Sequence, residues 1–196
     1  MSMHRLVLSA LLAALTIAVP TPAAAQTKTI DIARSTITIH VGKEGLFSAA
    51  GHEHWVSAPI ASGEISETGD RSVKFAVDAH RLKVRPDPKV NQKDEAEIQE
   101  TMQQKVLESD KYPLVQFQSS SVAQAGNGSW SVTGKLTLHG VSKSIVVAVR
   151  QAGDAYSGKA LIKQTDFGIQ LVRAAGGAVR VKDEVEVQFD IYARPR

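Results

Sequence analysis

The feature of this sequence that most constrains its fold is a repeated alternation of apolar and polar side chains. Val73, Phe75 and Val77 are separated by single polar or small residues, and Val187 and Phe189 are spaced in the same way near the end of the chain. Successive side chains of a β-strand point to opposite sides, so such a segment buries one face and exposes the other. The alternation therefore predicts an all-β fold.

Eight segments combine this alternation with flanking turn residues such as Gly69-Asp70 and Gly153-Asp154. The predicted strands are residues 29–41, 53–66, 71–82, 114–123, 129–139, 143–152, 155–167 and 180–193. The first strand should bend near Ala33, because its apolar parity changes there. Eight antiparallel strands lose their exposed edges by closing into a barrel. A barrel of this size either packs its interior with side chains or holds one ligand, and a two-sheet sandwich shows the same alternation.

One amphipathic helix interrupts the series of strands. Between Asp94 and Glu108, Ile98, Met102 and Val106 recur every four residues and would place a narrow apolar stripe on a neighbouring surface. Asp94 is expected to cap the start of the helix, and Pro113 prevents its continuation. The sequence thus predicts one helix flanking the strands.

The first 25 residues have the pattern of a cleavable export signal. Arg5 precedes an apolar run from Leu6 to Val19, and Ala23-Ala24-Ala25 forms a signal-peptidase site, so cleavage is expected before Gln26. We therefore expect residues 1–25 to be a signal peptide, residues 26–196 to be a single domain, and the location to be the periplasm. The apolar run is shorter than the ~20 residues of a membrane-spanning helix.

Composition narrows the class of partner. The chain has 23 basic and 20 acidic residues without basic clusters, which argues against nucleic acid as a partner. It has no cysteine, so neither disulfides nor cysteine nucleophiles contribute. After the leader, no apolar stretch is long enough to insert stably into a membrane. An unpaired strand edge would permit a homodimer, although no heptad pattern favours one.

Three local motifs resemble those of the YceI-like family of periplasmic proteins. They are Tyr112-Pro113-Leu114-Val115-Gln116-Phe117-Gln118-Ser119, Gly134-Lys135-Leu136-Thr137-Leu138-His139-Gly140-Val141 and Asp166-Phe167-Gly168-Ile169. Their order and spacing also agree with the family. The resemblance implies an eight-stranded, lipocalin-like antiparallel β-barrel with one helix at its side. It also implies an apolar interior that takes up a polyisoprenoid, a quinone-like chain or a fatty amide.

The candidate binding residues follow from the strand faces. Those expected to point into the barrel and line a ligand cavity are Phe75, Val77, Phe117, Leu136, Leu138, Val147, Phe167, Val187 and Phe189. Three further candidates for the ligand-binding lining are His52, His54 and Trp55, and the two histidines would lie near the barrel mouth. His139 lies in a predicted hairpin turn, where its ring either bonds neighbouring backbone or supplies a polar group at one end of the cavity.

An alternative function would use His52 and His54 as metal ligands. Residues i and i+2 of a strand point the same way, so both imidazoles could face one metal ion. A convincing site needs a third convergent ligand, which the spacing does not supply, and we therefore expect no metal and no cofactor other than a bound long-chain amphiphile. A metal-binding protein or a small metal-dependent hydrolase remains the second hypothesis.

No motif for catalysis is present. The sequence lacks the Gly-x-Ser-x-Gly nucleophile motif, a Walker loop and a Gly-x-Gly-x-x-Gly turn. Asp166-Phe167-Gly168 matches a kinase motif by letters only, because the other kinase motifs are missing. The sequence therefore favours a binding or carrier protein, not an enzyme.

Overall fold

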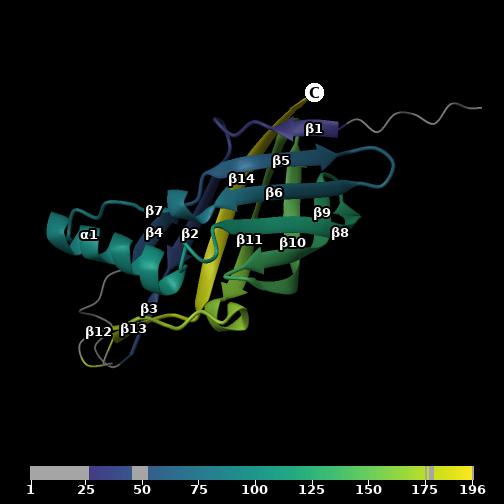
Figure 1. Cartoon of the computed structure of the whole chain (residues 1–196). Coiled ribbons are helices and arrows are strands. Elements are labelled where there is room, and N and C mark those ends of the chain that lie inside the picture. The colour runs from purple at the N-terminus through teal and green to yellow at the C-terminus, as the bar shows by residue number, and fades with distance from the viewer. Residues whose placement is uncertain (1–26, 46–52, 175, 177–178, 196) are drawn as a thin grey trace, which may run out of the picture.

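The computed structural model describes residues 27–45, 53–174, 176 and 179–195. Eight strands form a closed antiparallel ring in the order β1-β5-β6-β8-β9-β10-β11-β14, and β14 pairs back with β1 (Figure 1). The bounds of the ring strands are β1 Thr27–Ile30, β5 Ile60–Ser66, β6 Ser72–Asp78, β8 Leu114–Gly126, β9 Ser129–Leu138, β10 Val141–Ala152, β11 Ala155–Lys163 and β14 Glu184–Pro195. The predicted eight-stranded antiparallel barrel with one flanking helix is confirmed.

Three of the predicted strands divide into two strands each, and the last of them, residues 180–193, becomes β13 (Val179–Val181) and β14. The first becomes β1 and β2 (Thr36–Val41), separated by a turn at residues 31–35, as the change in parity predicted. β14 pairs with both parts, joining Ala193 to Ile30 of β1 and Val187 to Ile39 of β2. The second predicted strand becomes β4 (His54–Ser57) and β5, with Pro59, which has no N–H to donate, in the break.

Two predicted strand ends were wrong, because side chains turn the backbone into 3₁₀-helices there. Residues 79–81 form the turn η2 (Ala79–Arg81), with the carboxylate of Asp78 accepting from the N–H of His80, and the chain then resumes as β7 (Lys83–Val84). At the end of β11, η4 (Gln164–Phe167) replaces the predicted strand, and the carboxylate of Asp183 accepts from the N–H of Thr165. Both capping contacts offer the backbone a partner other than a neighbouring strand.

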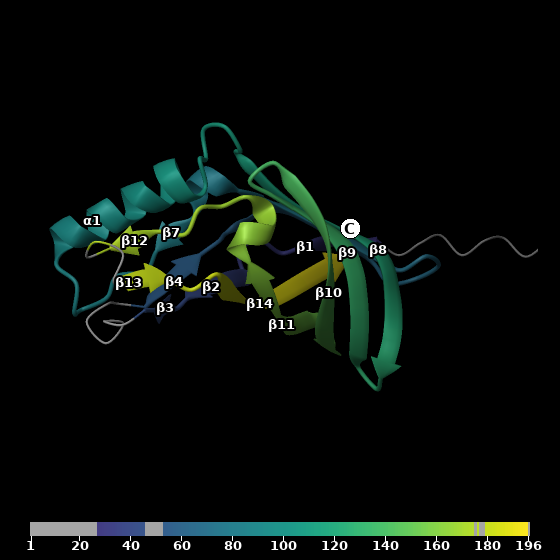
Figure 2. The ribbon, with the colours of Figure 1, turned by 90° about the horizontal axis from the view of Figure 1, so that it is seen from below.

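The flanking helix α1 (Gln92–Thr101) continues into a π-helical turn, η3 (Met102–Val106). The expectation that Asp94 caps the helix was wrong: the N-cap is Asn91, whose side-chain oxygen accepts from the N–H of Asp94 at 3.0 Å. Figures 1 and 2 show α1 beside β7 and away from the C-terminus. No helix in the described part of the chain is long and apolar enough to cross a membrane.

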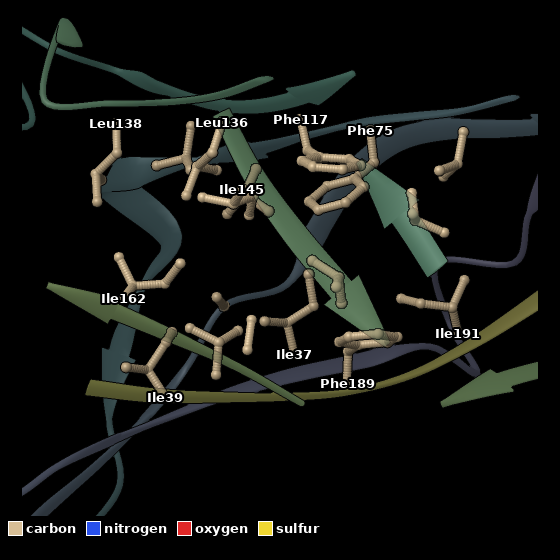
Figure 3. Close-up of a pocket in the computed structure, with 18 of the residues that line it drawn as sticks. Ile37, Ile39, Phe75, Phe117, Leu136, Leu138, Ile145, Ile162, Phe189 and Ile191 are labelled. Atoms are coloured by element: carbon tan, nitrogen blue, oxygen red, sulfur yellow. The ribbon is translucent and has the colours of Figure 1, made fainter. Parts of the chain in front are cut away.

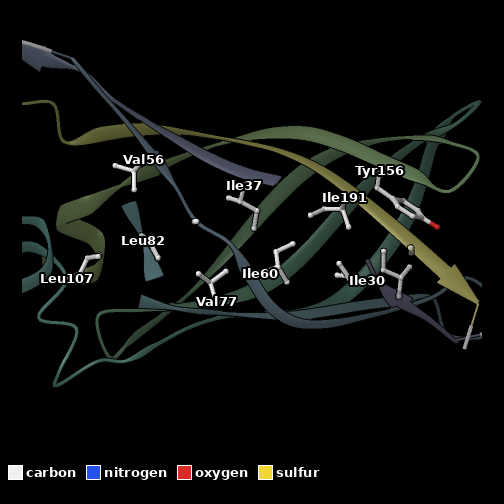
Figure 4. Packing of buried hydrophobic residues seen from close by; sticks show 12 residues of the cluster. Ile30, Ile37, Val56, Ile60, Val77, Leu82, Leu107, Tyr156 and Ile191 are labelled. Carbon is white, nitrogen blue, oxygen red and sulfur yellow. The ribbon is translucent and has the colours of Figure 1, made fainter. Parts of the chain in front are cut away.

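A small second sheet and two apolar clusters complete the fold. The sheet pairs β12 (Arg173–Ala174), β13 (Val179–Val181) and β3 (Lys43–Glu44). The larger cluster lies inside the barrel, and Figure 4 shows it extending from Leu107 to Tyr156. The smaller cluster gathers residues of β11, η4 and β14 around Phe167, which is 2% exposed. Apolar burial is therefore concentrated in and beside the barrel lumen.

Candidate ligand-binding cavity

The barrel encloses a cavity of about 290 Å³. All eight ring strands contribute to its wall, together with β2, β4, the π-helical turn and Leu107. Close-packed protein interiors contain few voids larger than one water molecule, so a space of this size is not ordinary packing. The sequence left open whether the interior is packed or hollow, and the structure shows that it is hollow.

Eight of the predicted lining residues lie on this wall. They are Phe75, Val77, Phe117, Leu136, Leu138, Val147, Val187 and Phe189. Phe75 and Phe117 face each other across neighbouring strands with their ring centroids 5.6 Å apart, and Figure 3 shows Phe189 on the opposite side of the cavity. The structure thus places these side chains together, and their contact with a ligand remains a prediction.

Two glycines allow the large rings to lie along the wall. A Cβ on Gly134 would collide with the ring of Phe117, and a Cβ on Gly158 would lie 2.6 Å from the ring of Phe189. Each ring therefore occupies the place that a side chain on the neighbouring strand would fill. This arrangement keeps both aromatic side chains against the barrel and leaves the lumen free.

Three other candidates do not line the cavity, which corrects the prediction. Phe167 is buried in the smaller cluster, because the turn η4 replaces the strand whose parity would have pointed it inward. Trp55 lies on the outer face, 38% exposed, with its ring stacked on His40 at 4.4 Å. His139 lies outside the lumen in the β9–β10 turn.

The predicted metal ligands His52 and His54 cannot be compared in the structure, because only His54 is among the described residues. His54 begins β4 opposite Val41 and is not on the cavity wall, and His52 lies outside the described residues. The nearby His40 Nε2 lies 3.0 Å from the Glu53 carboxylate. Within the described ranges, no three His, Cys, Asp or Glu residues come together to hold a metal ion.

His139, which belongs to the second sequence motif, contacts residues of the other two motifs. Its Nε2 lies 2.6 Å from the carboxylate of Glu108, and its Nδ1 lies 3.2 Å from the carbonyl oxygen of Phe167. The ring of Tyr112 packs against the imidazole at 4.4 Å. His139 therefore does not line the cavity, and its ring bonds residues 28 and 31 positions away in the sequence instead of the backbone of its own turn.

A polar cluster that sequence reasoning missed lies on the cavity wall. Glu67 Oε2 pairs with Lys28 Nζ at 2.6 Å, and Oε1 accepts hydrogen bonds from Tyr156 and, at 2.7 Å, from Gln151 Nε2. Burial raises the pKa of Glu67, but the hydrogen bonds from Lys28 and Tyr156 outweigh it and hold that pKa below its usual value. Burial, and then the bond to Glu67, raise the pKa of Tyr156, which therefore stays protonated and donates.

Two further side chains belong to the same end of the cavity. Arg71 and Trp130 both line the wall, with the guanidinium carbon 4.2 Å from the centroid of the indole ring. Alternation within residues 129–139 already placed Trp130 on the apolar face, so the sequence contained a signal for it. The sequence contained none for Glu67 and Arg71, which come from the β5–β6 turn.

The closed antiparallel ring and its apolar interior define a lipocalin-like β-barrel with an internal cavity. The comparison with known families is more specific. The chain belongs to the YceI-like domain family, whose family model matches residues 28–193.

Curated relatives match only part of the chain. A UPF0312 protein of Vibrio cholerae serotype O1 (strain M66-2) is 33% identical over 79 residues, which is 35% of this chain and 42% of the relative. A UPF0312 protein of Azotobacter vinelandii is 34% identical over 70 residues, or 31% of this chain and 36% of the relative. These alignments span less than half the length of either relative.

Solved structures match over most of the chain. Burkholderia cenocepacia BcnA superposes with a TM-score of 0.59 at 21% identity, covering 84% of this chain and 99% of BcnA. A polyisoprenoid binding domain from Saccharophagus degradans, implicated in plant cell wall breakdown, gives a TM-score of 0.61 at 16% identity, covering 88% and 99%. At these identities the likeness shows a common fold.

Proposed function

We propose that this chain is a periplasmic carrier that holds one long-chain apolar molecule inside its barrel. The observation that carries the proposal is the hollow interior, whose wall is almost entirely aliphatic and aromatic. An apolar cavity of this kind is poorly hydrated, so a hydrocarbon chain that enters it loses water without displacing hydrogen-bonded solvent. In this proposal the barrel binds its ligand and does not transform it.

The proposed ligand class is a polyisoprenoid, a quinone-like chain or a fatty amide. Each buried CH₂ contributes about 0.8 kcal/mol, so affinity would grow with chain length and need few specific contacts. The family membership supports this class, as does the common fold with the Saccharophagus degradans domain, which is described as polyisoprenoid-binding.

The periplasmic part of the proposal rests on the leader pattern of residues 1–25, which lie outside the described residues. It is tested by expressing the full chain in a Gram-negative host and fractionating the cells. The mature protein should appear in the periplasmic fraction with Gln26 as its first residue. An uncut chain in the cytoplasm would overturn this part.

The carrier function is tested by native mass spectrometry of the purified mature protein, followed by organic extraction. We expect an added mass that extraction removes and that is identified as a long hydrocarbon chain. A chain of bare polypeptide mass that also fails to take up an added polyprenol or fatty amide would overturn the proposal.

A pair of variants on one strand links any bound mass to the lumen. Ala160 of β11 lines the cavity, whereas its neighbour Leu161 points outward and is 62% exposed. Ala160→Phe should fill the lumen and reduce the bound fraction, and Leu161→Phe should retain it. Circular dichroism is used to check that both variants are folded. Equal retention by both variants would mean that the ligand binds elsewhere.

A further inference from the structure

The polar groups on the cavity wall are not evenly distributed. One acidic and one basic side chain line the described cavity, Glu67 and Arg71, and both belong to the turn between β5 and β6. Tyr156 and Trp130 lie with them, and Figure 4 shows Tyr156 at the end of the core opposite Leu107. The charged side chains of the described cavity wall therefore lie at one end, which we call the polar end. Gln164 of η4 is a polar lining residue away from this turn, and its amide already donates to the carbonyl oxygen of Lys182.

The negative charge at the polar end is already matched. Both oxygens of Glu67 are engaged, one by the ammonium group of Lys28 and the other by Tyr156 and Gln151. The carboxylate is thus neutralised and hydrogen-bonded within the protein. It offers no site for a cationic ligand group.

The two donors beside Glu67, the guanidinium of Arg71 and the indole N–H of Trp130, do not bond its carboxylate. The Arg71 guanidinium lies over the face of Trp130, while the two oxygens of Glu67 are taken by other residues. The indole Nε1 of Trp130 is buried and has no hydrogen-bond partner among the described residues. A buried donor without a partner is rare in proteins and calls for an explanation.

We propose that Arg71 and Trp130 form a head-group site that binds the anionic, oxygen-rich end of an amphiphile, such as a phosphate or carboxylate, while its hydrocarbon tail extends towards Leu107. The site supplies a guanidinium, which forms paired hydrogen bonds with phosphate or carboxylate oxygens, and beside it a buried indole N–H that has no acceptor among the described residues. Arg71 is exposed, so the charged group stays near solvent and only the tail enters the dry lumen.

This inference rests on the proposed carrier function and adds the charge and direction of the ligand. It predicts that a polyisoprenyl monophosphate binds more tightly than the alcohol with the same isoprenoid chain. It also predicts that a long-chain fatty acid binds more tightly than its amide. Both comparisons keep the tail constant, so they isolate the head group.

The test measures the dissociation constants of the phosphate and the alcohol for the full mature protein and three variants. Arg71→Gln should weaken phosphate binding roughly tenfold or more and leave alcohol binding nearly unchanged. Arg71→Lys should recover part of the preference. The control is Lys74→Gln on β6. The Lys74 side chain is 62% exposed and pairs with Glu64, so its removal should leave the dissociation constants of the phosphate and of the alcohol unchanged.

Each result separates the head-group site from the carrier function. Equal binding of phosphate and alcohol by the unaltered protein, or an equal loss for both in Arg71→Gln, would overturn the head-group site and leave the carrier function standing. Failure to bind either molecule would overturn both. Trp130→Phe keeps the ring and removes the N–H, so weaker phosphate binding in this variant would assign the unpaired donor to the ligand.

Discussion

The side chain of Gln99 completes the free edge of β7 at Val84. Its Oε1 accepts from the N–H of Val84 at 2.8 Å, and its Nε2 donates to the carbonyl oxygen of Leu82 at 3.0 Å. β7 is the last strand of its sheet, so these groups have no strand beside them. The helix therefore provides the hydrogen bonds that a further strand would have made.

The first prediction concerns this contact. Gln99→Ala should lower the free energy of unfolding by about 1–3 kcal/mol, because it leaves the N–H of Val84 without a partner. The carbonyl oxygen of Leu82 keeps a second donor, Gln103 Nε2, at 3.1 Å. The matched control is Gln104→Ala in the following π-helical turn, where the side chain is exposed and bonds only Glu100 among the described residues. Urea unfolding of both variants measures the difference, and equal stabilities would contradict the role given to Gln99.

A second prediction concerns Gly140, which has φ 73° in the β9–β10 turn. A Cβ there would lie 2.6 Å from the ring of Tyr112. Gly140→Ala should therefore cost backbone strain of about 1–2 kcal/mol and a further 1–3 kcal/mol for the collision. Gly153 has a similar φ, 62°, with nothing within 4 Å, so Gly153→Ala should show the strain alone. Thermal or urea unfolding that fails to separate the two variants would argue against the collision.

A third prediction concerns pH and Glu67. The pKa of Glu67 is lowered in the folded protein, so this group stabilises the fold above its ordinary pKa and loses that effect as the pH falls through the lowered value. Glu67→Gln should destabilise the protein by about 1–3 kcal/mol at pH 7. The difference in the free energy of unfolding between this variant and the unaltered protein should narrow in acid, once Glu67 of the unaltered protein is protonated.

Urea unfolding, which adds no salt, tests this dependence at pH 7 and at the lowest pH at which the protein stays folded. Glu97→Gln, on the exposed side of α1, provides the control and should have little effect at either pH. A gap for Glu67→Gln that stays constant between the two pH values would show that the charge of Glu67 does not stabilise the fold.

A fourth prediction concerns His139, whose side chain is 11% exposed. His139→Phe keeps a ring against Tyr112 but leaves Glu108 and the carbonyl oxygen of Phe167 without this partner, and it should cost about 1–3 kcal/mol. His80→Phe is the comparison, because His80 is 46% exposed and its partners are exposed aspartates. A clearly smaller loss is expected there, and equal losses would argue against a stabilising role of the His139 contacts.

The strands could be predicted because alternation is a local property of the sequence. It located the barrel strands and the bend near Ala33. It failed at Gln164–Phe167, because the carboxylate of Asp183, which turns this segment, comes from a later part of the chain. Phe167 was wrongly predicted to line the cavity for the same reason, because the turn changes the side to which its ring points.

The cavity could be predicted only in part, for a similar reason. Parity placed Phe75 and Phe117 inside, but it does not say whether rings meet across a barrel or lie along its wall. That depends on Gly134 and Gly158, which make room for rings from neighbouring strands. The polar end depends on Lys28, Glu67 and Tyr156, which meet only in three dimensions.

The pairing of β1 with β14 determines when the barrel can form. Residues 28–30 pair with residues 193–195, so the ring joins the beginning of the domain to its end. During synthesis the early strands cannot close the ring, and their apolar faces stay uncovered, until β14 has left the ribosome. A protein of this topology cannot enclose a ligand while it is being made. If the chain is exported, as the leader pattern predicts, and crosses the membrane unfolded, the ring would close and the carrier would first load after translocation, on the far side of the membrane.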